Sequence, residues 1–163
     1  MSESYTVIFL LDTLPPTRII FLKRALSKAF APGLYTGIGG KIEAGEAALQ
    51  GAYREMEEET GLINPTLSLF ATCSIDEEIF LHYYWGIHSG ALPECNEGDL
   101  EWVAIEHIQQ KHIIPTTAHI LTEWQRRNFD TNNRWEVWMR RTEKIDTFWD
   151  VDVITITDQL PEK

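Results

Sequence analysis

The stretch GKIEAGEAALQGAYREMEEETGL, residues 40–62, decides the fold of this chain. Its spacing predicts a helix over residues 46–60, and Gly61 is typical of the left-handed residue that ends a helix. Four apolar residues of this helix recur at helical spacing and would face the core: Leu49, Ala52, Tyr53 and Met56. The stretch therefore predicts a helix that packs one side on a sheet.

Three carboxylates share a second face of the predicted helix, because Glu55, Glu58 and Glu59 follow one another at i, i+3 and i+4. Like charges at this spacing repel, and the helix dipole disfavours anions near the C-terminus. A hard divalent cation would relieve both effects, since Mg²⁺ and Mn²⁺ prefer oxygen ligands. From spacing alone, a solvated acidic face remains the alternative to a metal site.

The same stretch resembles the Nudix box, G-x5-E-x7-R-E-U-x-E-E-x-G-U, in which U is a bulky apolar residue. Met56 and Leu62 occupy apolar positions. The fixed positions are all filled: Gly40, Glu46, Arg54, Glu55, Glu58, Glu59 and Gly61. A looser likeness covers IIFLKR before the box and GDLEWVAIEHI after it. TGIGGKIEAGE is similar to the branch that contains the 8-oxo-dGTP diphosphatases and related nucleoside-triphosphate pyrophosphohydrolases.

The resemblance implies a metal-dependent pyrophosphohydrolase acting on a nucleoside diphosphate linked to another moiety. The first candidate substrate is a (d)NTP such as 8-oxo-dGTP, which water would cleave to the monophosphate and pyrophosphate. The implied ligands of Mg²⁺, or alternatively Mn²⁺, are the carboxylates of Glu55, Glu58 and Glu59 and the carbonyl of Gly40.

Glu97 lies five residues before Trp102, where relatives carry a further acid, and Glu94 and Asp99 compete for that role. The implied catalytic residues are Glu55, Glu58 and Glu97, any of which could take the proton of the attacking water. The resemblance does not decide among them.

Other residues have implied structural or substrate-binding roles. The resemblance implies that Arg54 pairs with Glu46 and, like Gly61, is structural. The implied substrate-binding residues are Lys23, Thr36, Gly39 and Lys41, with solvated surface lysines as the alternative for Lys23 and Lys41.

The residues that would read the base depart from those of the oxidised-purine enzymes. Thr36 stands where those enzymes carry an Asn, and residues 114–117 hold no acid. Another nucleotide, such as an ADP-ribose-like one, therefore remains open. Two other classes also remain open: a non-catalytic nucleotide-binding Nudix domain and a structural cation-binding protein.

The remaining pattern predicts an α/β (α+β) fold, a Nudix-like mixed β-sheet sandwiched between helices within one domain, residues 1–163. A second helix is expected over residues 116–127, capped by Thr116 or Thr117. The expected strands are residues 5–11, 18–22, 67–75, 78–87 and 100–105, and residues 134–141 and 147–157 would add a C-terminal β-hairpin.

Composition limits the classes of partner and the cellular location that the sequence predicts. The 163 residues carry a net charge of −11, which argues against a nucleic-acid polymer as partner but permits a small nucleotide substrate. Cys73 and Cys95 do not form a disulfide framework, and the short N-terminal apolar run has no basic segment before it. These features predict a cytoplasmic protein with no membrane association, and leave the oligomeric state open.

Overall fold

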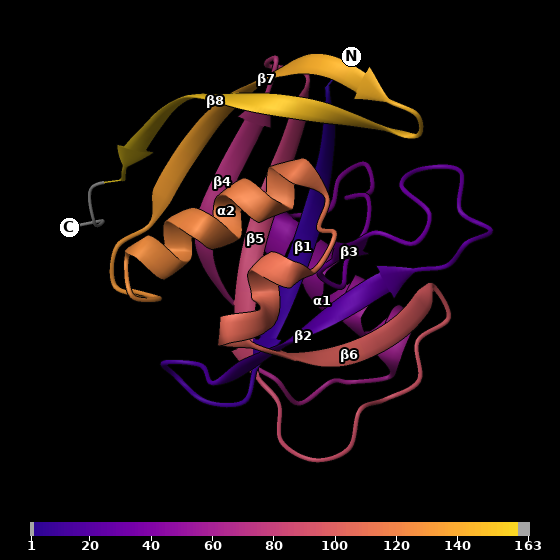
Figure 1. The fold of residues 1–163 in the computed structure, drawn as a ribbon. Helices are drawn as coiled ribbons and strands as arrows, with labels where there is room; N and C mark the ends of the chain where they lie inside the picture. The colour runs from indigo at the N-terminus through magenta and orange to yellow at the C-terminus, as the bar shows by residue number, and fades with distance from the viewer. Residues whose placement is uncertain (1, 160–163) are drawn as a thin grey trace.

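The computed structural model describes residues 2–159 (Figure 1). The helices are α1 (Ala48–Thr60), the short 3₁₀ helix η1 (Ile105–Gln110) and α2 (Pro115–Arg126). The strands are β1 (Glu3–Leu11), β2 (Arg18–Arg24), β3 (Tyr35–Thr36), β4 (Ser68–Ile75), β5 (Ile79–Ile87), β6 (Gly98–Ala104), β7 (Trp135–Ile145) and β8 (Phe148–Asp158).

One mixed sheet organises the molecule. The strand order is β3-β2-β1-β5-β4-β7-β8, and β6 pairs with β2 outside this path. The β1–β5 and β4–β7 pairs are parallel, whereas the other pairs are antiparallel. The predicted mixed sheet with a C-terminal hairpin is therefore confirmed.

Helices cover both faces of the sheet, with α2 in front of it and α1 behind it in the view of Figure 1. Because successive side chains of β1 point to opposite faces of the sheet, this strand contributes to the core on both faces. Ile8 packs in a cluster with Met56 of α1, and Phe9 packs in a cluster with Trp124 of α2. Trp124 also stacks on Phe70 with ring centroids 3.8 Å apart.

The first helix begins two residues later than predicted, at Ala48, and ends at Gly61 as expected. The Oε1 atom of Gln50 accepts a hydrogen bond from the Ala47 backbone nitrogen at 3.0 Å, which satisfies one free donor of the first turn. Gly61 has φ of 74° and donates its N–H to the Glu57 carbonyl. The left-handed conformation at this position explains why glycine fits there.

The start of α2 differs from the prediction. Ile114 is the N-cap residue and Pro115 occupies the first helical position, so neither Thr116 nor Thr117 caps the helix. Proline suits that position because the missing N–H would have had no partner there. Both threonines lie inside the helix and are buried.

The C-terminal hairpin extends the sheet, because β7 lies parallel to β4 and pairs antiparallel with β8. Strand β7 ends four residues later than predicted, whereas β8 has the predicted length and is shifted by one residue. Within residues 2–159, none of the helices has both the length and the apolar character needed to cross a membrane.

Candidate active site

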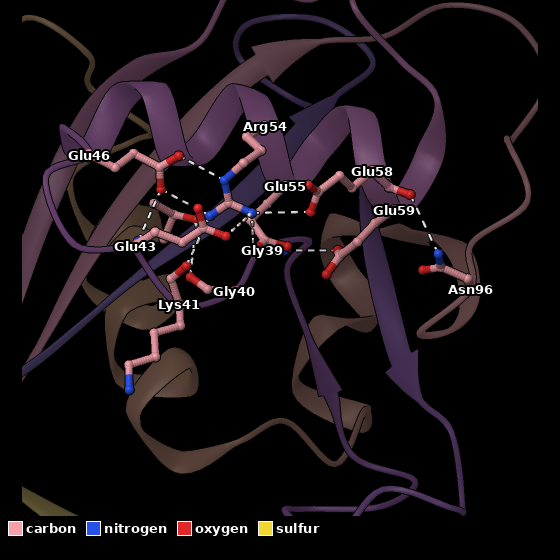
Figure 2. Close-up of polar contacts among 11 residues, drawn as sticks. Gly39, Gly40, Lys41, Glu43, Glu46, Arg54, Glu55, Glu58, Glu59 and Asn96 are labelled. Carbon is pink, nitrogen blue, oxygen red and sulfur yellow. Dashed lines mark hydrogen bonds and ion pairs between the residues drawn. The ribbon is translucent and has the colours of Figure 1, made fainter.

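Arg54 is the centre of the polar network on α1 (Figure 2). Its Nε and Nη2 donate to the two carboxylate oxygens of Glu46 at 2.7 and 2.9 Å. Its Nη1 donates to Glu55 at 2.9 Å and to Glu58 at 3.1 Å. Nη2 also reaches the Lys41 carbonyl at 3.1 Å. One guanidinium therefore joins the loop before the helix to two of the candidate ligands.

These hydrogen bonds stabilise the charged forms of both partners. The Arg54 hydrogen bonds, followed by that of the Glu43 backbone, lower the pKa of Glu46 to about 2. The pKa of Arg54 is raised above its ordinary value, first by Glu46. The bidentate geometry is the one in which a guanidinium binds a carboxylate most strongly.

Glu59 lies on the inner side of the same helix and is buried, with only 8% of its surface exposed. Its carboxylate accepts the Gly39 N–H at 3.2 Å, as Figure 2 shows. Burial, and then the charge of Glu55, raises the pKa of Glu59 to about 8. This carboxylate is therefore held in a place where negative charge is unfavourable by itself.

The glycine-rich loop brings its backbone against these carboxylates. A Cβ atom at Gly40 would lie 2.7 Å from the Glu55 carboxyl group, so a larger residue there would displace that carboxylate from its position. The Gly40 carbonyl accepts a hydrogen bond from the Thr6 nitrogen at 2.9 Å. The Thr6 hydroxyl also donates to this oxygen, at 3.5 Å, so a metal ion bound to the carbonyl would replace that long hydrogen bond.

The donor set fits a hard divalent cation in its chemistry. Glu55, Glu58, Glu59 and the Gly40 carbonyl offer only oxygen, and a cation beside Glu59 would offset the charge repulsion that raises its pKa. The side chains do not converge, however. Across residues 2–159 no three His, Cys, Asp or Glu side chains are arranged to hold a metal ion. Glu55 and Glu58 turn to Arg54 instead.

A cavity of about 560 Å³ opens beside this network. Glu59 and Glu97 place carboxyl groups in its wall, and Arg24 contributes a guanidinium. Hydroxyl groups and apolar side chains line the rest, among them Thr6, Thr36, Thr116, Thr117, Ile79, Leu81 and Tyr83. The volume lies in the range of sites that bind small molecules and cofactors.

The structure separates the proposed substrate-binding residues into two groups. Thr36 and Gly39 line the cavity, whereas Lys23 and Lys41 lie outside its lining. Lys23 is exposed on β2. The Lys41 ammonium lies 3.6 Å from a carboxylate oxygen of Glu3.

Among the three acids that compete near the start of β6, only Glu97 lines the cavity. Its carboxylate forms an ion pair with Lys28. Glu94 and Asp99 are exposed.

Sequence reasoning missed Arg24, Phe30 and Tyr83. The Arg24 Nε donates to the Phe30 carbonyl at 2.8 Å, and the guanidinium lies 5.4 Å from the Phe30 ring centroid. The Tyr83 hydroxyl lies 3.2 Å from the Thr117 hydroxyl. Strand alternation could have identified Arg24, because Leu22 and Arg24 face the cavity while Lys23 between them does not. Phe30 and Tyr83 had no comparable signal.

Comparison with known proteins agrees with this architecture. A model of the NUDIX domain matches residues 4–125. The oxidized purine nucleoside triphosphate hydrolase of Mus musculus is 27% identical over 124 residues, 72% of this chain and 76% of that protein. The Nudix hydrolase YvcI of Bacillus subtilis (strain 168) is 32% identical over 99 residues, 55% of this chain and 63% of that protein.

The fold is also found among solved structures. The crystal structure of the MutT protein from Bacillus halodurans superimposes with a TM-score of 0.69 at 19% identity, covering 96% of this chain and 97% of that one. The domain match covers most of the chain and includes all of helix α1. The chain therefore belongs to the Nudix family and is a nucleotide pyrophosphohydrolase with a MutT-like fold.

Proposed function

We propose that this enzyme hydrolyses a nucleoside triphosphate to the monophosphate and pyrophosphate, with 8-oxo-dGTP as the first substrate to test. The observation that carries the proposal is the composition of the cavity wall. Glu59 and Gly39 line one part of the cavity, and hydroxyl groups and apolar side chains line the rest. A nucleotide has the matching division between charged phosphates and a flat, largely apolar base. The mouse relative, by its name, acts on oxidised purine nucleoside triphosphates.

Nudix hydrolases generally use divalent metal ions, and we propose Mg²⁺, or alternatively Mn²⁺, for this enzyme. Glu55, Glu58, Glu59 and the Gly40 carbonyl would hold it. When bound, the ion would neutralise charge on the phosphate oxygens. These residues would need to turn from Arg54 toward a common point, because Glu55 and Glu58 are paired with it in the structure.

Direct attack by water requires a group that accepts a proton. Glu97 is our first choice because it lines the same cavity as Glu59. Its carboxylate is held at the cavity wall by an ion pair with Lys28. Glu55 and Glu58 are the other two candidates. The arginine Arg24, on the same wall, is positioned to contact an anionic substrate.

Substrate choice depends on Thr36, Thr116 and Thr117, which line the cavity. A hydroxyl both donates and accepts a hydrogen bond, so these residues read a base edge less strictly than a carboxylate or carboxamide would. Another (d)NTP or a nucleoside diphosphate linked to a sugar therefore belongs in the same test. Residues 1–163 would act as one such Nudix unit on a small nucleotide.

The test is a panel of 8-oxo-dGTP, dGTP, dATP and ADP-ribose, assayed with Mg²⁺ and read out as released pyrophosphate or monophosphate. We expect turnover of a triphosphate that EDTA abolishes. We expect Glu58→Gln to lower kcat/KM by at least about a hundredfold, the scale for loss of a key electrostatic group.

Glu57→Gln is the matched control, because Glu57 is an exposed neighbour on the same helix outside the fixed positions of the box. It should leave kcat/KM unchanged. Equal activity of wild type and Glu58→Gln would disprove the metal assignment. Turnover of ADP-ribose alone would redirect the substrate assignment while leaving the chemistry intact.

A further inference from the structure

The C-terminal hairpin (Trp135–Asp158) contacts the wall of the nucleotide cavity from outside. Its strands lie at one end of the strand order, whereas β3 lies at the other end. The hairpin turn nevertheless reaches the loop that follows β2, and in Figure 1 the hairpin crosses the top of the sheet toward that loop. Phe148, the first residue of β8, makes this contact.

Phe148 belongs to a small apolar cluster that is separate from the two core layers. The cluster contains Phe148, Ala31 and Leu34, which are buried, and Ile114 packs against it. His112 also meets the Phe148 ring edge to face, with centroids 5.9 Å apart. An aromatic side chain at the start of an edge strand is thus buried against two segments distant from it in sequence.

Both segments supply residues to the cavity. Residues 24–36 contribute Arg24, Phe30 and Thr36, and Ile114 lines the cavity directly. Phe148 itself does not line it. Phe148 therefore touches one side of Ile114 while the cavity lies on another, so it stands behind the wall rather than in it.

Backbone hydrogen bonds join the two segments to each other, and residues 24–36 pair with the sheet through β3 and Arg24. The Tyr35 nitrogen donates to the His112 carbonyl at 2.9 Å, and the Ile114 nitrogen donates to the Tyr35 carbonyl at 3.0 Å. The Arg24 nitrogen donates to the Leu34 carbonyl at 2.9 Å. β3 has only two residues, so apolar packing must supply much of the order of this wall.

We propose that Phe148 is a positioning residue for substrate binding, which keeps the wall formed by residues 24–36 and 112–114 in its binding-competent arrangement. It acts through Ile114 and Leu34 and makes no contact with the reacting atoms. Loss of its ring would lower the fraction of molecules with an ordered wall. Apparent affinity for a nucleotide falls in proportion to that fraction, whereas the chemical step after binding is unchanged.

Hydrogen exchange of the metal-free and nucleotide-free protein tests the proposal without relying on the proposed function. In Phe148→Ala we expect amides of residues 24–36 and 112–114 to exchange at least about fivefold faster, because local opening becomes easier. Strand β1 should keep its wild-type rate. Ile154→Ala is the matched control, since Ile154 lies on the same strand and is 61% exposed. Its exchange should match wild type.

The second arm measures kcat and KM for 8-oxo-dGTP and dGTP, and this arm rests on the proposed function. We expect Phe148→Ala to raise KM about tenfold with kcat within about twofold of wild type. Phe148→Leu, which retains apolar volume, should restore most of the affinity and covers the case in which Phe148→Ala fails to fold.

The proposal is wrong if exchange in the two segments is unchanged, if it rises equally throughout the sheet, or if kcat falls while KM stays constant. A wild-type enzyme that hydrolyses none of the triphosphates in the panel would overturn the proposed function, and the exchange data would still decide the role of Phe148.

Discussion

Arg54 binds both carboxylate oxygens of Glu46, with its Nε 2.7 Å from one and its Nη2 2.9 Å from the other. The remaining nitrogen, Nη1, donates hydrogen bonds to the carboxylates of Glu55 and Glu58. The pair therefore sets where the guanidinium lies, and the guanidinium in turn holds two proposed metal ligands. We therefore expect Arg54 to position the carboxylates of the site rather than to contact the reacting atoms.

Arg54→Lys should lower activity at limiting Mg²⁺ by about 10–100-fold, the range for loss of a group that orients metal ligands. A lysine ammonium cannot reproduce the planar fork. Titrating Mg²⁺ in the assay checks this, and saturating metal should restore part of the activity. Arg126→Lys on α2 is the control and should be neutral, because the Arg126 side chain is exposed although its partner Glu123 is buried. No response to added metal would contradict the orienting role.

The same pair predicts a loss of stability in acid. The pKa of Glu46 is lowered from 4.5 to about 2, so its contribution to folding is complete above pH 4.5 and is lost as pH falls through 2. Unfolding midpoints measured from pH 7 to pH 2 should therefore depend less on pH in Glu46→Gln than in wild type below pH 4.5. Identical slopes for the two proteins would show that the pair does not contribute.

Glu59→Gln should stabilise the metal-free protein while weakening its response to metal. The pKa of Glu59 is raised from 4.5 to about 8, so stability is highest below pH 4.5 and declines as pH rises toward 8. In EDTA at pH 8 we expect the variant to melt a few degrees higher, since about 1 kcal/mol corresponds to about 2–4 °C at this chain length. Melting curves in EDTA and in Mg²⁺ at pH 5 and pH 8 check this. A lower midpoint for the variant in EDTA at pH 8 would contradict it.

Gly39→Ala should both destabilise the fold and reduce activity. A Cβ atom at Gly39 would lie 2.0 Å from the Thr6 carbonyl oxygen, which is backbone and cannot rotate away. We expect a loss of about 1–3 kcal/mol in the free energy of unfolding, as for other overpacked sites. Gly45→Ala is the control, because φ is +78° there but the new Cβ would meet nothing within 4 Å. Urea denaturation compares the two, and an equal loss would show that steric overlap with Thr6 is unimportant.

Cys73 should resist alkylation in the folded protein, and Cys95 should react first. Burial, and then the charge of Glu136, raises the pKa of the Cys73 thiol to about 12, and only the thiolate is nucleophilic. Cys95 is partly exposed, although burial raises its pKa also. Mass spectrometry after a timed iodoacetamide pulse at pH 8 checks the order. Faster labelling of Cys73 would show that the sheet opens locally around β4.

The sequence could predict what depends on local pattern. The apolar spacing and Gly61 located the first helix, although Leu49, expected in the core, is exposed, and alternation located the strands of the C-terminal hairpin. The cap of α2 was mispredicted because Pro115 takes the first helical position, which leaves Thr116 and Thr117 facing the interior. Local rules name suitable caps but do not say which side chains the tertiary structure needs elsewhere.

The cavity could be predicted only in part. Thr36 and Gly39 lie close in sequence to the box, and the resemblance pointed to them. Arg24, Phe30 and Tyr83 reach the cavity from three different elements. Their meeting depends on the packing of β2 and β5 beside α2, and single-sequence spacing carries no information about it.

The position of β7 next to β4 has a consequence for how much of the chain must fold together. The match to the family ends at residue 125, whereas β7 supplies Trp135 and Val137 to the main core layer and pairs with the backbone of β4. A polypeptide ending at residue 125 would leave β4 as an unpaired hydrophobic edge, which invites association with other chains. The portion that the family model matches is thus shorter than the cooperative unit, and we expect residues 126–159 to melt with residues 4–125 in a single transition.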